Sequence, residues 1–573
     1  MGSKLLSDCH KGVTFDDDII ERRAKMADAT FDVVIIGGGT KSLVTAIYLA
    51  KYGGMTVGVF ERRHEVGGGL SSTEAPAPGF IGDTHASNVS LDYYIPIEED
   101  FPDFLEKGAK RVQWKGCAGA ITREEHRCYL VYNSHDDPSQ EHSAREIARA
   151  AGEKDAETYL KIWQYAQSAD YVGALADEWL NMRPFTLEPS PLDRWFMEWF
   201  KRPDCPIDPE WLILPPIVAA QQLFDTFGLS LIWLRRALAN DTQIVEPMGA
   251  KMFFHWILAQ PLLAFVIGGT HSVAHAYVRI LLENGGKFFT HSEVNQIIVE
   301  NGVAKGIRLS DGTEIEARKA VLSGVDPHQL CFRLLGEEHL SQRIIRKVKL
   351  LQGGHGAITW YTWAIYEPAN FRAADFNPDI NVTHNIALGS EDPDIWWQEY
   401  YMRCLGQNPP IESKILYHHY AGVDKSRAPE GKQTCLTEQF VAPAPSLSEQ
   451  EWLQFKKTHA EDVIRELQEY APNMTWDNII GYDPQTPYDT AARLINMPWG
   501  DPNVYNNEPW RPIPMRPITE FSQHHIANIK NLYGTGEAWF WAGGACNEGY
   551  RAYKVIAEDL GLRKPWEEKG RPW

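Results

Sequence analysis

A glycine-rich turn between an apolar strand and a helix constrains this chain more than any other feature. Residues 33–36 read Val-Val-Ile-Ile, Gly37-Gly38-Gly39 follows, and the next apolar residues fall at helical spacing. A second predicted strand, residues 56–60, ends on Glu61. A strand, a glycine turn, a helix and an acidic residue about 20 positions later are the pattern of a dinucleotide-binding βαβ unit.

Each position of this unit has a physical reason. Gly37 permits the tight turn, and Gly39 lets backbone N–H groups approach a pyrophosphate. The helix that follows offers unpaired donors and a partial positive charge to that anion. Glu61 is placed to accept hydrogen bonds from a ribose. The third small position is Ser42 instead of glycine or alanine, which predicts that the helix and the strand lie slightly further apart there.

A second glycine turn, Gly67-Gly68-Gly69, follows soon after the acidic residue. A nicotinamide dehydrogenase has no need for a glycine turn at this place. A flavin enzyme does, because a longer dinucleotide passes more backbone. The second turn therefore favours a flavin.

Composition excludes several classes of protein. The 573 residues are 44% hydrophobic and 23% charged, which indicates two to four globular units or one large α/β body with an inserted domain. The net charge of −20 argues against nucleic-acid binding and weakens attachment to anionic lipid. The eight cysteines are scattered without a CxxC pair, which predicts no metal or disulfide framework and suits a reducing compartment.

No segment predicts export or membrane insertion. The first 30 residues are polar and lack a signal-peptide pattern, so we predict an N-terminal arm and a cytoplasmic location. Residues 252–278 carry no Asp, Glu, Lys or Arg and are mostly apolar, but histidine, proline and glycine interrupt them. A buried or membrane-surface segment fits this stretch better than a span, and peripheral membrane contact stays open.

The later chain alternates between two patterns. Residues 143–163 look helical and 211–267 are the most apolar part, which predicts a helical cap. Residues 271–284 predict a helix, followed by strands joined at Asn-Gly and Asp-Gly turns up to Ser323. Mixed strands and one long helix, residues 448–470, predict a second segment outside the dinucleotide-binding pattern. The chain then ends in a glycine-initiated helix.

Four ordered blocks carry a resemblance to a known family. They are the glycine fingerprint with Glu61, the second turn, residues 268–327, and residues 534–557. Together they resemble the flavin-dependent amine-oxidase/phytoene-desaturase superfamily, and more closely its bacterial-type phytoene dehydrogenase branch. The resemblance extends over residues 31–562, nearly the whole chain.

The resemblance implies an α/β fold in which a Rossmann-like FAD-binding domain is assembled from three segments. An α+β substrate domain containing a helical cap is inserted between them. The implied FAD-binding segments are residues 31–120, 265–340 and 515–562. The implied substrate segments are residues 121–264 and 341–514. Residues 1–30 form an arm and residues 563–573 a tail.

The resemblance also implies the cofactor residues. Val294 pairs its backbone with the adenine, Glu537 lies by the ribityl-pyrophosphate, and the helix near Gly544 points at the flavin ring. The implied cofactor-binding set is Gly37, Gly39, Thr40, Ser42, Glu61, Arg62, Gly68, Gly69, Leu70, Val294, Gly536, Glu537, Gly544 and Ala545.

The sequence departs from the family pattern at two places. The usual basic residue of the second turn is missing, with Gly69-Leu70 in its place. The Pro-Gly-Gly-Gly pattern of carotenoid desaturases is replaced by Trp541-Ala-Gly-Gly-Ala, and Trp539 and Phe540 add bulk. These departures argue against a long, linear C40 polyene as substrate.

The flavin itself accepts the hydride, so the protein must hold an apolar substrate, exclude water and remove a proton. We predict Trp539, Phe540 and Trp541 as the substrate wall, with core packing as the alternative. His85 is a candidate general base, and a structural histidine is the alternative. Tyr550 and Arg551 are also candidate catalytic residues, Arg551 as a stabiliser of the anionic reduced ring or as an exposed helix residue. No metal site is predicted.

The leading interpretation is an FAD-dependent oxidoreductase that abstracts hydride from an apolar terpenoid, isoprenoid or alicyclic substrate and forms a double bond. Electrons leave to a quinone, another carrier or oxygen. The alternatives are a redox-neutral isomerase or a saturase of the same fold, a flavin amine oxidase, and a non-catalytic flavin-bound subunit of a heteromer. A homo-oligomer and a hetero-oligomer both stay open.

Overall fold

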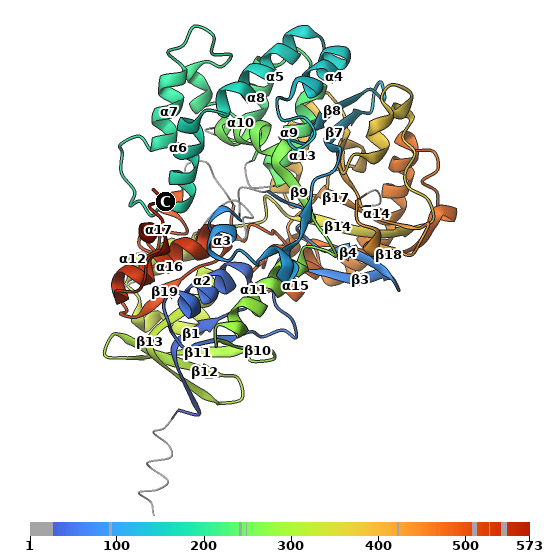
Figure 1. The fold of residues 1–573 in the computed structure, drawn as a ribbon. Helices are drawn as coiled ribbons and strands as arrows, with labels where there is room; N and C mark the ends of the chain where they lie inside the picture. Colours follow the sequence, from blue (N-terminus) through green and yellow to red (C-terminus); the bar gives the residue numbers. More distant parts are fainter. Residues whose placement is uncertain are drawn as a thin grey trace, which may run out of the picture.

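The computed structural model describes residues 27–90, 94–239, 243–247, 249–420, 423–506, 513–526, 528–539 and 547–573. The predicted site residues Phe540, Trp541, Gly544 and Ala545 lie outside these ranges, as does most of the predicted N-terminal arm. Two sheets form the two halves of the molecule, with a layer of helices over the second (Figure 1).

The first sheet contains seven described strands in the order β10-β2-β1-β13-β12-β11, with β19 also paired to β13. Its bounds are β1 Ala29–Ile36, β2 Val57–Phe60, β10 Lys287–Phe289, β11 Val294–Glu300, β12 Val303–Leu309, β13 Glu314–Ser323 and β19 Leu532–Gly534. The strands β10, β2, β1, β13 and β19 run parallel, and β11 and β12 form an antiparallel extension. The central strand β1 is fully apolar at its end because both faces of the sheet are covered.

Helices from three parts of the chain cover one face of this sheet. They are α2 (Thr40–Lys51), α11 (His271–Glu283) and α16 (Asn547–Leu560), and α2 packs against both of the others. The shorter helices are α3 (Ile95–Asp100), α12 (Gln342–Lys349), α15 (Pro487–Arg493) and α17 (Pro565–Glu568).

The second sheet also has seven described strands, in the order β18-β14-β17-β16-β15-β7-β8. Its bounds are β7 Gly116–Thr122, β8 Cys128–Tyr132, β14 Ile358–Ile365, β15 Asn385–Gly389, β16 Lys414–His419, β17 Gln433–Phe440 and β18 Ile479–Gln485. Only the described β15–β7 pair of this sheet is parallel.

The two faces of the second sheet have different coverings because side chains alternate along each strand. Tyr361, Trp363 and Cys435 share a core with the long helix α14 (Glu449–Tyr470), which a Ser448–Glu451 capping box starts. The opposite face carries Trp360 and Leu436, which share a core with the helical cap.

The cap lies above the second sheet (Figure 1). It consists of α4 (Glu141–Ala151), α5 (Glu153–Ala166), α6 (Ala169–Leu180), α7 (Pro191–Trp199), α8 (Pro216–Leu223), α9 (Phe227–Ala239) and α10 (Ala250–Ala259), with α13 (Pro393–Cys404) beside it. Small sheets join the two halves: β3 (Ser72–Ala77) with β4 (Phe80–Asp83), and β9 (Leu263–Val266) between β5 (Val89–Ser90) and β6 (Arg111–Val112).

The mixed α/β fold predicted from the sequence is confirmed, and several boundaries differ. The helix predicted over 143–163 is two helices, since Gly152 has a φ of +104° between α4 and α5. The predicted division at 120/121 falls inside β7, which belongs to the second sheet, and that at 264/265 falls inside β9. The division into three FAD-binding segments itself stays a prediction.

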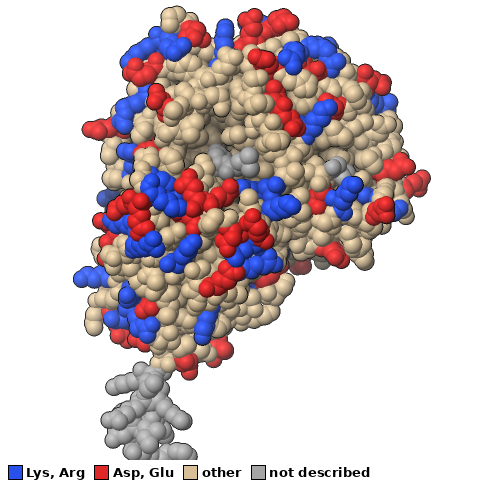
Figure 2. All heavy atoms as spheres, in the orientation of Figure 1, with Lys and Arg blue, Asp and Glu red and all other residues tan. Residues whose placement is uncertain are grey.

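Two surface properties bear on function. Within the described residues, no helix is both long and apolar enough to cross a bilayer. Lys and Arg interleave with Asp and Glu over the face shown in Figure 2, and a hollow lies near its centre.

Candidate functional site

One cavity extends from the glycine turns of the first sheet to the second sheet. We call its two ends the glycine end, lined by Gly37, Gly39 and Gly67–Gly69, and the sheet end, lined by His85, Ser87, Trp360 and Glu438. The predicted site residues that line the cavity are Gly37, Gly39, Thr40, Ser42, Glu61, Arg62, Gly68, Gly69, Leu70, His85, Val294, Gly536, Glu537 and Trp539. The structure thus brings residues of three distant segments to one cavity. Their roles stay predictions.

The first glycine turn leaves backbone donors at the glycine end. Gly37 has a φ of +89°, and Gly39 is the N-cap of α2. This helix start has no side-chain cap and no acidic residue in its first turn. A Cβ on Gly39 would have no described atom within 4 Å, so the space beside it is open. The unsatisfied N–H groups of α2 and this open space fit an anionic group.

The second glycine turn is bonded directly to the first. The N–H of Gly67 donates to Gly38 O at 2.9 Å. Gly67 has a φ of +99°, and a Cβ there would lie 2.6 Å from Leu70 O. A side chain at this position would therefore strain the second turn and press against Leu70 and helix α11.

Ser42 is accommodated by a glycine on the neighbouring strand. The Ser42 side chain is buried, and a Cβ on Gly324 would lie 2.0 Å from its Oγ. Gly324 follows directly on β13 and lines the same cavity. The room that the hydroxyl needs is thus provided by Gly324.

Two carboxylates define opposite sides of the glycine end. Glu61 accepts from the N–H of Gly38 at 2.7 Å and from that of Arg63 at 2.8 Å, which fixes its carboxylate at the end of β2. Glu537 forms an ion pair with Lys41 at the start of α2. Its Oε1 and the hydroxyl of Thr535 are buried and have no partner among the described residues, so both remain available to a ligand.

Charged side chains of both signs line the cavity, with Glu61, Glu65, Glu293, Asp326 and Glu537 among the carboxylates. Five cationic side chains line the cavity: Lys41, Arg62, Arg63, Arg333 and Arg493. Arg493, at the end of α15, donates to Ser71 Oγ at 3.2 Å, directly after the second glycine turn. Burial lowers the pKa of Arg493 to about 10, at which it remains charged at neutral pH. A distant segment therefore supplies the positive charge that the second turn lacks.

The placement of His85 argues against its predicted role as a general base. Arg493 Nη2 lies 2.5 Å from His85 Nε2, so this nitrogen accepts a hydrogen bond and the ring is neutral. Burial, followed by the charge of Arg493, lowers the pKa of His85 well below its usual value. The ring also packs edge-on against Trp360, with centroids 5.1 Å apart. His85 is held as a neutral structural group.

The other predicted catalytic residues do not line the described part of the cavity. Tyr550 packs against Tyr48 in the core under α2. Arg551 is buried, with its Nη1 3.7 Å from Glu548 Oε2, so it is not an exposed helix residue either. Trp539 reaches the cavity, but its indole N–H donates to Phe521 O at 3.0 Å within the core. Neither Tyr550 nor Arg551 is placed to touch a substrate there.

Apart from His85, the polar groups of the sheet end were not predicted from the sequence. Trp360 pairs with Glu438 across β14 and β17, and Leu416 pairs with Glu438 across β16 and β17. His418 is two residues beyond Leu416, so His418 and Glu438 share one face of the sheet. His418 Nε2 lies 2.9 Å from Glu438 Oε1, and Ser87 Oγ lies 3.0 Å from His418 Nδ1. Strand alternation in the His418-His419 pair indicated that only one of them could face a pocket, but did not say which.

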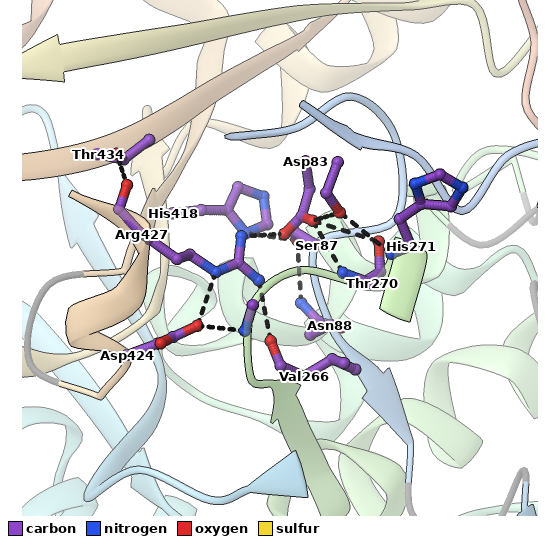
Figure 3. Close-up of polar contacts among 12 residues, drawn as sticks. Asp83, Ser87, Asn88, Val266, Thr270, His271, His418, Asp424, Arg427 and Thr434 are labelled. Atoms are coloured by element: carbon purple, nitrogen blue, oxygen red, sulfur yellow. Dashed lines mark hydrogen bonds and ion pairs between the residues drawn. The ribbon is translucent and has the colours of Figure 1, made fainter. Parts of the chain in front are cut away.

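A buried charge cluster holds the loop that carries Ser87 (Figure 3). Arg427 Nη1 donates to Asp83 Oδ2 at 2.6 Å and its Nε donates to Asp424 Oδ2 at 3.2 Å. Asp83 also accepts from the N–H of Thr270, whose hydroxyl donates to Ala86 O at 2.8 Å. The cluster joins β4, β9 and the segment between β16 and β17, and so connects the two ends of the cavity.

A family model described as an NAD(P)-binding Rossmann-like domain matches residues 35–104. One of the subunits of limonene dehydrogenase from Castellaniella defragrans is 24% identical, and the alignment covers 94% of this chain and 96% of that protein. A phytoene desaturase from Rhodobacter capsulatus is 27% identical over 32% of each chain. The solved structure of a redesigned putrescine oxidase superimposes with a TM-score of 0.57 at 13% identity, covering 93% of this chain and 99% of that one.

Residues 35–104 thus match an NAD(P)-binding Rossmann-like domain, and the chain is similar to a dehydrogenase subunit and to phytoene desaturases, as the resemblance to the amine-oxidase/phytoene-desaturase superfamily predicts. The predicted resemblance and the predicted enzyme class are thereby confirmed. The likeness to putrescine oxidase shows the fold alone. In the described residues, no group of three or more His, Cys, Asp or Glu side chains is arranged to hold a metal ion.

Proposed function

We propose that this flavoenzyme uses FAD to remove hydride from a small apolar substrate, terpenoid or alicyclic, and forms a carbon–carbon double bond. The observation that carries the proposal is the single cavity that passes both glycine turns and ends against the second sheet. Its glycine end suits a dinucleotide, and its sheet end leaves a separate place for a substrate.

The residues present fit FAD. The uncapped start of α2 and the cationic side chains around it suit the pyrophosphate. Glu61 is positioned for the adenosine ribose and Val294 for the adenine, while the unpartnered oxygens of Thr535 and Glu537 suit the ribityl side. When bound, the flavin supplies the acceptor for the hydride. The chain's own task is to orient the substrate and keep water out.

The sheet end disfavours an amine as substrate. Glu438 is the carboxylate at this end, but Arg235 Nη2 lies 3.6 Å from its Oε2 and His418 lies on its other side. Its charge is therefore balanced inside the protein and is not left for an ammonium group. The similarity to a protein named limonene dehydrogenase supports an alicyclic hydrocarbon instead.

The proposal extends to partners. One relative that is similar over nearly the full length is named as one of the subunits of a dehydrogenase, which supports a hetero-oligomer with a second, different chain. We propose that electrons leave to a quinone or a protein carrier, with oxygen as the alternative. Co-expression with candidate partner chains followed by size-exclusion chromatography tests the assembly.

The function is tested with the purified flavoenzyme under anaerobic conditions. We expect a flavin spectrum, release of FAD on denaturation, and stoichiometric bleaching of the flavin by monoterpenes such as limonene. Isomerisation would convert substrate without bleaching, and an amine oxidase would be bleached by amines and release peroxide with oxygen. Absence of bound flavin after expression with ample FAD would refute the proposal.

A further inference from the structure

A line of three polar side chains leads from the cavity into the second sheet. Ser87 and Glu438 both line the sheet end, and His418 lies buried between them. Ser87 Oγ is 3.0 Å from His418 Nδ1, and His418 Nε2 is 2.9 Å from Glu438 Oε1. Figure 3 shows His418 beside Ser87 and Asn88.

We propose that Ser87, His418 and Glu438 form a proton relay, with Ser87 Oγ as the group that takes a proton from the substrate. The inference rests on the proposed dehydrogenase function and deepens it. Ser87 is the candidate catalytic residue, because it faces the cavity. His418 receives the proton, and Glu438 is a positioning residue that acts through His418.

Dehydrogenation of two neighbouring carbons needs such an acceptor. One C–H bond breaks with its electron pair, and hydride leaves to the flavin, which gains two electrons. The C–H bond on the neighbouring carbon also breaks, and its electron pair forms the new C=C π bond. Its proton bonds to Ser87 Oγ while the hydroxyl proton moves to His418 Nδ1. The substrate loses two electrons in total, and the proton ends on the histidine.

The surroundings select the tautomer that this step requires. A carboxylate accepts only, so Glu438 Oε1 at 2.9 Å from Nε2 favours a proton on Nε2 and an unprotonated Nδ1 that accepts from Ser87. Arg235, from cap helix α9, lies 3.6 Å from the other oxygen of Glu438, so this carboxyl group has a cation beside one oxygen and His418 beside the other.

His85 does not compete for this role, because Arg493 occupies its Nε2. The next histidine along the strand, His419, projects to the opposite face of the sheet, where its ring lies near that of Tyr417. His418 and His419 therefore form a matched pair: adjacent in sequence, both buried, and only one directed toward Ser87.

The first test measures the tautomer and needs no substrate. The flavoenzyme is labelled with 15N-histidine, and the His418 signals are assigned by their loss in His418→Gln. We expect Nδ1 to be unprotonated and Nε2 protonated, and Ser87→Ala to shift the Nδ1 signal. His419→Gln serves as the control that leaves the His418 signals in place. A proton on Nδ1 of His418 would overturn the relay, even if the flavin is reduced normally.

The second test measures the rate of anaerobic flavin reduction by a substrate that bleaches the wild-type enzyme. Ser87→Ala removes one oxygen atom and keeps the fold, so we expect an unchanged substrate Kd and about a 100-fold slower reduction. Glu438→Gln is expected to slow reduction and to shift its pH profile. Reduction within threefold of the wild-type rate in Ser87→Ala refutes the relay but leaves the proposed function intact. Failure of every hydrocarbon to reduce the wild-type flavin counts against the proposed function instead.

Discussion

The two ends of the cavity are built by different means. At the glycine end, the backbone makes the surface: glycine turns approach each other, and helix α2 begins without a side-chain cap. At the sheet end, side chains from paired strands make the surface, and their identity follows from register and alternation. A binding site made of backbone requires glycine at a few positions, but it tolerates many different residues around them. A side-chain site depends on single atoms and can be changed by one substitution.

The two ends therefore differ in how far their chemistry can vary. The glycine end has a general function, and the sheet end has one that can be adjusted. The glycine end suits any pyrophosphate, because N–H groups and cations recognise the anion without regard to the substrate. The sheet end determines which molecule can react and how its proton leaves. Substitutions should therefore affect cofactor affinity at one end and reaction rate at the other, and the buried cluster between them should affect stability.

The largest expected effect is on the cluster that connects the two ends. Arg427→Met leaves the carboxylates of Asp83 and Asp424 buried without their cation, which should lower the free energy of unfolding by about 3–5 kcal/mol. Urea unfolding followed by circular dichroism measures this. Arg465→Met, which breaks an exposed pair with Asp462, is the control and should cost less than about 1 kcal/mol. Equal effects of the two changes would contradict the assigned role of the cluster.

The next largest effect concerns the glycine end alone and is measured as the amount of bound flavin. Gly67→Ala places a Cβ 2.6 Å from Leu70 O at a φ of +99°, so we expect at least a tenfold loss of flavin affinity. Flavin absorbance per protein after dialysis measures this. Gly302→Ala, at a φ of +74° with open space around it, bears a similar backbone strain far from the cavity and should retain the flavin. A full flavin complement in Gly67→Ala would show that the second turn accommodates the added methyl group without loss of the cofactor.

A smaller effect concerns the cation that α15 supplies. Arg493→Gln removes a charge beside the second glycine turn and should raise the flavin Kd by about tenfold, equivalent to about 1.4 kcal/mol. Arg493→Lys should recover part of this at low ionic strength. Fluorescence titration of the flavin-free protein with FAD gives both values, and an unchanged Kd would mean that the other cations suffice.

The smallest effect per residue is on stability at acid pH. It comes from buried histidines that lie outside both ends of the cavity. Burial lowers the pKa of His255 and His524 to about 3 and that of His419 and His459 to about 4. Below about pH 6.5 the unfolded chain therefore binds protons that the folded chain does not, so stability falls as the pH falls from about 7 to about 4. Each histidine should cost roughly 1 kcal/mol between pH 6.5 and 5.5.

Glu548 changes stability with pH in the opposite direction. Burial raises its pKa to about 7, so its ionisation destabilises the folded state as the pH rises from about 4.5 to 7. Melting temperatures between pH 5 and 8 test the balance. Replacing His459 by glutamine should reduce the acid sensitivity by about one proton, and an unchanged pH dependence would contradict the assignment of a buried, neutral His459.

The glycine end was largely predictable from the sequence, and the sheet end was not. Gly37, Gly39 and Glu61 are recognisable because a tight turn, a close approach and a terminal acid each demand a particular residue type. Three strands of the second sheet, β14, β16 and β17, were also predicted from the sequence. Their register was not, and register alone places His418 and Glu438 on one face beside Ser87.

The roles that the sequence left open have the same physical origin. His85 looked like a base because of its residue type and its place in a loop, but the sequence could not show that Arg493 arrives from 408 positions away to occupy its nitrogen. The sequence shows that the second turn lacks the usual basic residue. Only the tertiary structure shows that Arg493 supplies a positive charge there. Local chemistry is predictable when the backbone enforces it, and less so when it depends on long-range packing.

Strand β19 and the Gly536–Glu537 turn have a consequence for biosynthesis. They join the first sheet and complete the glycine end, yet they follow the first glycine turn only after the whole second sheet and the cap. The ribosome must therefore synthesise all of these intervening segments before this end of the cavity can close. Cofactor loading is then a late, post-translational event, and a truncated or stalled chain would expose the glycine turns of its first segment without the means to retain a flavin.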